Sequence, residues 1–180
     1  IKGLEIDPEQ FKPATLASKI SSLKSELIDW KNFKVSAINY FEETIAKVYE
    51  AYQKQLERNN ALDFDDLIML TVELFSKFPQ ILKKYREKFK YILVDEYQDT
   101  NTAQYVLINL LAKKYKNICA VGDDAQSIYK FRNADFRNIL NFERDYPEAK
   151  IVVLDQNYRS TQNILDTAHR VISKNIYQRE

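Results

Sequence analysis

Two adjacent carboxylates, Asp95 and Glu96, end a short apolar run in the segment 91–101, YILVDEYQDTN. A carboxylate at the end of a buried strand can hold Mg²⁺ as a hard oxygen ligand. Its neighbour can orient or deprotonate an attacking water. The pair is therefore typical of a nucleotide-hydrolysing site. The same two acids could instead only cap the helix that follows, and the pair alone does not separate these interpretations.

A nucleotide site of this kind normally includes a glycine-rich loop that cradles the phosphates. The two glycines of this chain, Gly3 and Gly122, do not belong to a G-x-x-x-x-G-K-[ST] pattern. The carboxylates are thus present without their usual partner. Because the chain opens with IKGLEIDPEQ, without an initiator Met or a signal-peptide pattern, we expect it to be cut from a longer protein.

A second group of residues that could do chemistry lies in VGDDAQSIYKFR, where rings and cations alternate after Gln126: Tyr129, Lys130, Phe131 and Arg132. Alternation predicts that rings and charges occupy different faces of an extended segment. Exposed rings could stack on unpaired bases while the cations contact phosphates. The alternative is that both rings point into the core.

Arg159 follows the apolar run of LDQNYRST. At the end of a strand its planar guanidinium could clamp a γ-phosphate or a carboxylate. An isolated arginine in that position could equally form a structural ion pair.

The elements that must position these residues change character near residue 90. Before it, apolar residues recur every three or four positions, which predicts helices over 11–30 and 36–59. A third helix is predicted to begin in LDFDDL with Asp63 as its N-cap, and a fourth to begin at Pro79.

After residue 90, the runs KYILVD, NICAVGD and AKIVVLDQN predict three strands that end at Asp95, Asp123 and Asp155. Helices are predicted between them, over 102–115 and 134–146. Runs that are apolar on both faces indicate a parallel sheet covered by helices, and ligands bind beyond the carboxyl ends of such strands. The predicted fold is α/β, with a helical subdomain over residues 1–58 and part of an α/β core over 59–180.

Composition sets the remaining limits. The chain has 180 residues, of which 45% are hydrophobic and 29% charged, with a net charge of +1. No basic stripe indicates nucleic acid. One cysteine and one histidine exclude an internal disulfide and a His/Cys zinc site. We expect a cytoplasmic protein, not a membrane protein, with Cys119 buried as a small apolar residue.

Four segments, in this order and spacing, resemble superfamily 1A DNA helicases of the UvrD, Rep and PcrA type: LDFDDL, YILVDEYQDTN, AVGDDAQSIYKFRNAD and LDQNYRST. The segment IDPEQFKP resembles the 1B subdomain of that family. The resemblance implies a partial RecA-like P-loop NTPase sheet flanked by helices. Residues 1–58 would be 1B-like, and residues 59–180 would be 1A-like.

For the nucleotide, ATP with Mg²⁺, the resemblance assigns a role to each matching residue. Asp95 would hold the magnesium and Glu96 would activate the hydrolytic water. Gln126 and Arg159 would contact the γ-phosphate, and Tyr158 would stack near the adenine.

For single-stranded DNA, Tyr129 and Phe131 would stack on bases, while Phe64 and Arg132 would line the same path. Two positions depart from the family pattern. Phe131 stands where a Trp is usual, which keeps a stacking face but shrinks it. Asn133 stands where a Gly is usual, and Asn tolerates a left-handed backbone better than most residues.

The implied function is an ATP-dependent DNA helicase or translocase, used in DNA repair or replication, that moves on single-stranded DNA and at single-strand/duplex junctions. The Walker A loop and the second motor domain would lie outside this chain, so the chain alone is predicted to be inactive. One alternative is a stand-alone, non-catalytic DNA- or protein-binding module. Another is a metal-dependent nuclease, suggested by Asp123 together with Glu148 and Lys150.

Overall fold

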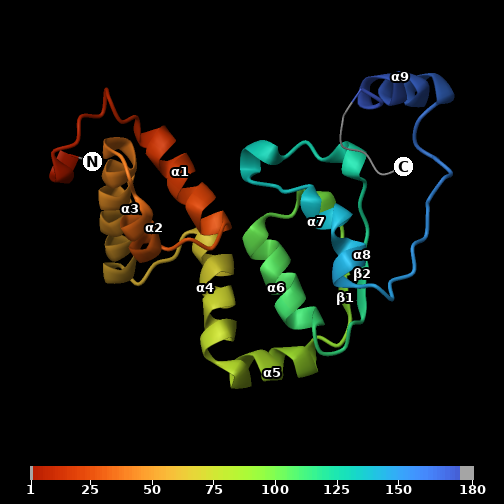
Figure 1. The fold of residues 1–180 in the computed structure, drawn as a ribbon, viewed down its shortest axis with the longest axis horizontal. Coiled ribbons are helices and arrows are strands. Elements are labelled where there is room, and N and C mark those ends of the chain that lie inside the picture. The colour runs from red at the N-terminus through yellow and green to blue at the C-terminus, as the bar shows by residue number, and fades with distance from the viewer. Residues whose placement is uncertain (1, 175–180) are drawn as a thin grey trace.

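Three helices form the N-terminal part of the protein. The computed structural model describes residues 2–174, and Figure 1 shows these helices packed together at one end of the molecule. They follow a short 3-10 turn, Lys2–Leu4, and are α1 (Pro13–Ser25), α2 (Trp30–Ser36) and α3 (Tyr40–Arg58). The predicted apolar spacing is confirmed in α1, where Leu16, Ile20 and Leu23 are in the core, whereas the core residues of α3 include Ile45 and Tyr49.

The helix predicted over 11–30 ends earlier, because α1 stops at Ser25 and a separate helix, α2, begins at Trp30. Leu27 adopts a left-handed backbone, with φ of 62°. The N–H of Ile28 donates to the carbonyl of Leu23 at 2.9 Å, and that of Leu27 to the carbonyl of Lys24 at 2.9 Å. These bonds form a Schellman motif, which satisfies the last carbonyls of α1 and ends it. Asp29 then caps α2, because its side chain accepts from the N–H of Asn32 at 2.7 Å.

Two helices, α4 (Phe64–Lys77) and α5 (Pro79–Lys88), connect the N-terminal part to the sheet. The predicted N-cap of α4 is confirmed. The Asp63 side chain accepts from the N–H of Asp66, and the Asp66 side chain accepts from the N–H of Asp63, which is a complete capping box. Pro79 begins α5 as predicted.

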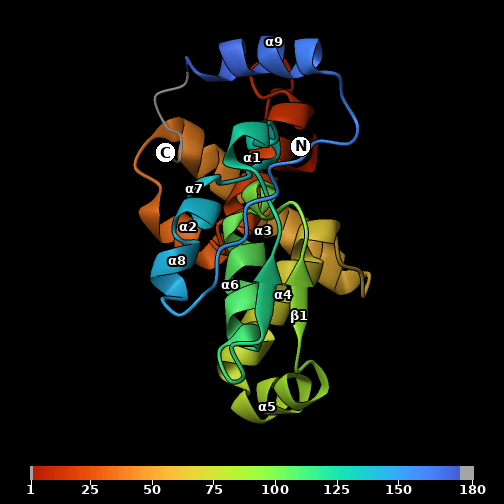
Figure 2. The same cartoon turned by 90° about the vertical axis from the view of Figure 1, so that its right-hand side faces the viewer.

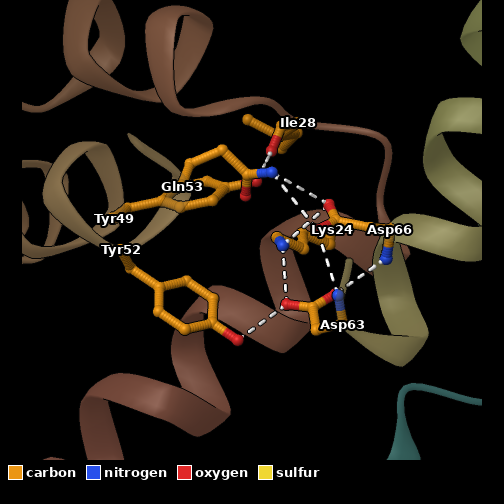
Figure 3. Close-up of polar contacts among 7 residues, drawn as sticks. All are labelled: Lys24, Ile28, Tyr49, Tyr52, Gln53, Asp63 and Asp66. Atoms are coloured by element: carbon orange, nitrogen blue, oxygen red, sulfur yellow. Dashed lines mark hydrogen bonds and ion pairs between the residues drawn. The ribbon is translucent and has the colours of Figure 1, made fainter. Parts of the chain in front are cut away.

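A buried lysine joins α1 and α3 to the start of α4 (Figure 3). Lys24 is 1% exposed, and its Nζ lies 2.7 Å from Asp63 Oδ2 and 2.8 Å from Asp66 Oδ1. Gln53 Nε2 also donates to both oxygens of Asp66, and the Tyr52 hydroxyl donates to Asp63. Because a buried charge is tolerated when it is paired, these contacts fix three helices relative to one another.

The sheet of the described residues has two parallel strands, β1 (Ile92–Val94) and β2 (Ile118–Ala120). Their register pairs Ile92 with Ile118 and Val94 with Ala120. Helix α6 (Thr102–Ala112) connects them and lies beside the sheet in Figures 1 and 2. A parallel arrangement was predicted from the apolar runs and is confirmed.

The predicted third strand is wrong. Residues 151–156 have no regular secondary structure, and Ile151, Val152, Val153 and Leu154 are 56–82% exposed. A strand that is apolar on both faces is stable only where a neighbouring strand and covering layers are present. Here the outer face of the sheet is open, since Leu93 is 79% exposed.

The same open face explains a second wrong prediction. Cys119 pairs with Leu93 in the sheet and is exposed, whereas the sequence predicted a buried cysteine. Alternate residues of a strand point to opposite faces, so a cysteine in an apolar run is buried only if its own face is covered. The run alone does not specify which face that is.

The chain after β2 contains short elements. The segment predicted as one helix over 134–146 forms two, α7 (Arg137–Leu140) and α8 (Phe142–Asp145). Two 3-10 turns, Asp124–Gln126 and Lys130–Arg132, precede them, and α9 (Gln162–Ile172) follows. No helix among the residues described is long and apolar enough to cross a membrane. The division at residues 58/59 stays a prediction.

Candidate nucleotide and nucleic-acid site

The acid pair follows the carboxyl end of β1, and both carboxylates are exposed. Glu96 has a left-handed backbone, with φ of 49° and ψ of 46°, which is uncommon for a residue other than glycine. Its N–H donates to Asp95 Oδ1 at 2.9 Å. This turn directs the chain from β1 into the 3-10 turn Tyr97–Asp99. Glu96 stands at the N-cap position of this 3-10 turn but its side chain makes no cap hydrogen bond there, and Asn101 is the residue that caps α6.

Gln98 connects Glu96 with Asp123 in the segment after β2. The sequence analysis did not identify this residue. Gln98 is 1% exposed. Its Nε2 donates to Glu96 Oε2 at 2.7 Å, and its Oε1 accepts from the N–H of Asp123 at 3.0 Å. Gln126 Nε2 donates to Asp123 Oδ2 at 2.7 Å. Glu96 and Gln126, 30 positions apart, therefore belong to one hydrogen-bonded network. No spacing rule would have identified Gln98, because one of its two partners is a backbone group in the segment after β2.

Gly122 permits this network by allowing close packing. A Cβ at this position would lie 2.6 Å from Gln98 Oε1, 2.8 Å from Ile139 Cδ1 and 3.2 Å from the Tyr97 backbone nitrogen. Real side chains do not approach this closely, so a larger residue here would displace the Gln98 amide and the Ile139 side chain. Gly122 therefore serves packing and is not part of a phosphate cradle.

The residues at the strand ends fit a magnesium ion that is bound together with substrate phosphates. No group of three acidic, His or Cys side chains within residues 2–174 could hold a metal alone. Mg²⁺, however, commonly takes one or two protein carboxylates and completes its shell with phosphates and water. Asp95 is exposed and uses one oxygen for the N–H of Glu96, which leaves its second oxygen for a cation.

A pocket of about 400 Å³ opens beside the acid pair and extends to α6. Asp99, in its wall, has a buried Oδ1 without a hydrogen-bond partner. Burial raises the pKa of Asp99, and the nearby Glu96 carboxylate raises it further. The pocket is lined by Val94, Asp95, Glu96, Asp99, Thr100, Gln104, Leu107 and Ile108.

The aromatic residues after Gln126 lie at the surface, but their segment is not extended as predicted. Lys130–Arg132 forms a 3-10 turn. Tyr129 is 36% and Phe131 is 75% exposed, so neither ring is buried in the core. The guanidinium carbon of Arg132 lies 5.0 Å and 5.5 Å from the two ring centres. The cation thus contacts both rings and is not on the opposite face.

Asn133 has φ of 64° and ψ of 20°, so the expected left-handed turn is confirmed. Its N–H donates to the carbonyl of Lys130 at 3.0 Å, and the next N–H, of Ala134, donates to Tyr129 at 3.3 Å. Asparagine therefore closes the ring segment, which we define as residues 129–132.

The remaining predicted nucleotide- and DNA-binding residues are Phe64, Tyr158 and Arg159. Phe64 is the first residue of α4 and is 90% exposed. Tyr158 is 93% exposed, and the N–H of Arg159 donates to Asn157 Oδ1 at 2.9 Å within the same loop. Figure 1 shows this part of the chain running apart from the sheet toward α9. In residues 2–174, the structure joins Glu96 with Gln126 but does not bring Arg159 to them.

Comparison with known proteins gives a consistent result. Residues 1–147 match the UvrD/REP helicase N-terminal domain. Over 175 residues, 97% of this chain, it is 52% identical to the ATP-dependent DNA helicase PcrA of Leuconostoc citreum, covering 23% of that protein. The corresponding PcrA of Staphylococcus epidermidis is 54% identical over the same share of this chain, covering 24% of that protein. The chain therefore spans about a quarter of the length of these relatives. The resemblance inferred from the four segments is confirmed: the chain belongs to the UvrD/REP helicase family.

Proposed function

We propose that this chain forms part of an ATP-driven motor that moves on single-stranded DNA. The observation that supports this most is the network through Gln98. It connects the exposed acid at the end of β1 with Gln126, and the ring segment follows Gln126 directly in the chain. Residues suited to nucleotide chemistry and residues suited to base stacking are thus carried by neighbouring segments.

In this proposal Asp95 would supply a carboxylate oxygen to magnesium, and Glu96 would accept a proton from the attacking water. Gln98 holds Glu96 Oε2 at 2.7 Å, which leaves Oε1 for the water. Bound MgATP would supply the phosphoanhydride bond and a metal that neutralises the developing charge. Gln126, fixed by Asp123, would sense the γ-phosphate. Its Nε2 now donates to Asp123, so contact with a phosphate requires this amide to turn.

On the DNA side, Tyr129, Phe131 and Phe64 supply ring faces, and Arg132 supplies a charge next to two of them. Stacking of a base on an aromatic side chain contributes about 1–3 kcal/mol and does not depend strongly on sequence. These residues support single-stranded DNA as the ligand. Unwinding at a junction would be an activity of the whole motor.

The sequence contains no G-x-x-x-x-G-K-[ST] loop. Such a loop supplies backbone N–H donors and a lysine to the phosphates. Without them, the phosphates lose most of the positioning on which phosphoryl transfer depends. We therefore propose that the isolated chain binds MgATP weakly and hydrolyses it at a negligible rate. In a complete motor, Tyr158 would stack near the adenine and Arg159 would contact the γ-phosphate.

The test is Glu96→Gln in the full-length protein, with Glu148→Gln as the matched control. Loss of a general base should lower ATP turnover by about 10²–10⁴-fold while ATP binding is retained, and the control should keep full turnover. Near-normal hydrolysis by Glu96→Gln would show that Glu96 is not the base. Magnesium-dependent DNA cutting that Glu148→Gln abolishes would favour the nuclease interpretation instead.

A further inference from the structure

Ser25, at the end of α1, contacts two of the segments that carry the candidate site. It is 4% exposed. Its Oγ accepts from Asn101 Nδ2 at 3.4 Å and from Asn133 Nδ2 at 3.4 Å. Both contacts are longer than the usual N–H···O distance, but a hydroxyl oxygen has two lone pairs and can accept both. Asn101 follows the acid pair, and Asn133 closes the ring segment.

The two segments are also bonded directly to each other beside Ser25. The carbonyl of Thr100 accepts from the N–H of Asp135 at 2.9 Å and from Asn138 Nδ2 at 3.0 Å. Asn101 already uses its Oδ1 to accept from the N–H of Gln104 as the cap of α6. Its Nδ2 therefore remains to contact Ser25. The end of α1 thus lies against a polar junction between the two segments.

Asn133 contributes an amide that a glycine would lack. The left-handed backbone at this position, with φ of 64°, could be adopted at least as easily by glycine, the residue usual in the resembling family. Glycine would close the same turn but leave Ser25 without this donor. The contact between Ser25 and Asn133 is therefore a feature that the side chain of Asn133 adds to the turn.

We propose that Ser25 and Asn133 form a tie that positions the ring segment for single-stranded DNA, an inference that rests on the proposed function. Two residues before the ring segment, Ser127 Oγ donates to the carbonyl of Gln98 at 3.4 Å. The tie holds the end of the ring segment, after Arg132. A segment that is already ordered loses less conformational entropy when its rings stack on bases.

The test is a double-mutant cycle of Ser25→Ala and Asn133→Gly in this chain. Asn133→Gly keeps a residue suited to the left-handed backbone, and Ser25→Ala removes only a hydroxyl. Binding of a fluorescent oligothymidine is measured by anisotropy. Each single variant should weaken binding by about three- to tenfold, the factor for one ordinary hydrogen bond. The double variant should bind no more weakly than the weaker single variant. If the two single-variant factors multiply in the double variant, or if neither variant changes binding, the tie does not position the rings.

The matched control is Ser22→Ala, a serine on the same helix whose Oγ contacts Glu26 at 3.5 Å. It should leave binding unchanged. A second readout needs no DNA: the ¹H–¹⁵N signals of the Asn101 and Asn133 side-chain amides should move in Ser25→Ala but not in the control. A chain that binds no oligothymidine would overturn the DNA part of this inference, whereas the proposed function is decided separately by the ATP turnover of Glu96→Gln in the full-length protein. Unchanged amide signals would overturn the tie itself.

Discussion

Replacing Lys24 by Met removes the cation that Asp63 and Asp66 share. Methionine retains a long unbranched apolar side chain, so the substitution mainly deletes the charge. Removing one partner of a buried ion pair typically costs about 3–5 kcal/mol, since the other charge is left buried. Here Gln53 still donates to Asp66 at 3.2 and 3.3 Å, and the Tyr52 hydroxyl still donates to Asp63 at 3.0 Å. We therefore expect a loss at the lower end of that range, about 3 kcal/mol of unfolding free energy.

The loss should depend on pH. Burial alone would raise the pKa of Asp63, but hydrogen bonds from Lys24 and from the N–H of Asp66 lower it below its ordinary value. The stabilisation from Asp63 is thus complete above its unfolded pKa and disappears as pH falls through the lower folded pKa. Without Lys24 the effect of burial has less opposition and the folded pKa rises. Protonation of Asp63 then removes the unpaired buried charge from the variant as pH falls. The difference in unfolding free energy between the wild type and Lys24→Met should therefore shrink between pH 7 and pH 5.

Urea denaturation followed by circular dichroism at both pH values measures this difference. The control is Lys54→Met, which breaks an exposed pair with Glu50 and should change stability much less. If Lys24→Met costs only what an exposed pair costs, about 0–1 kcal/mol, the buried cluster does not fix the three helices. The same loss at both pH values would refute the assignment of that loss to an unpaired carboxylate.

Three further outcomes follow from the site and the sheet. Gly122→Ala should cost about 1–3 kcal/mol of unfolding free energy by overpacking, measured by urea denaturation, because its Cβ would lie 2.6 Å from Gln98 Oε1; unchanged stability would contradict the close packing. Phe131→Ala should weaken oligothymidine binding by about 1–3 kcal/mol, while Tyr91→Ala, which is also 75% exposed in the wild type, should not; equal effects would show nonspecific contact. Cys119 should react with a thiol reagent in the native protein, because it is exposed, and reaction only after denaturation would mean that its face is covered.

Local signals in the sequence predicted the helices well where chain neighbours determine the outcome. Asp63 caps α4 through contacts three residues away, and Pro79 begins α5 because its fixed φ suits the first helical turn. The end of α1 was missed because it depends on Leu27, a residue that rarely adopts a left-handed backbone. Ile28 and Trp30, which follow it, pack against the helical core, and no local pattern contains this contact.

Long-range features were predicted only in part. The apolar runs correctly indicated parallel pairing of β1 and β2, but they could not indicate that Leu93 and Cys119 share an open face. The resemblance pointed to Glu96 and Gln126 without indicating the residue that joins them. Gln98 is neither charged nor exposed, and it acts through one side-chain and one backbone partner. Such a residue becomes visible only when the strand ends are placed side by side.

The contacts around the acid pair argue for a rigid frame. Gln98, Thr100 and Asn138 are buried and hydrogen-bonded, and buried polar groups that are satisfied resist rearrangement because each broken bond would leave a costly unpaired group. A motor needs an element with two arrangements. We infer that this frame moves as one unit and carries Glu96 and the ring segment together. In the proposed motor, the alternating step would then lie at the surfaces of this frame, at the open face of the sheet and the exposed rings.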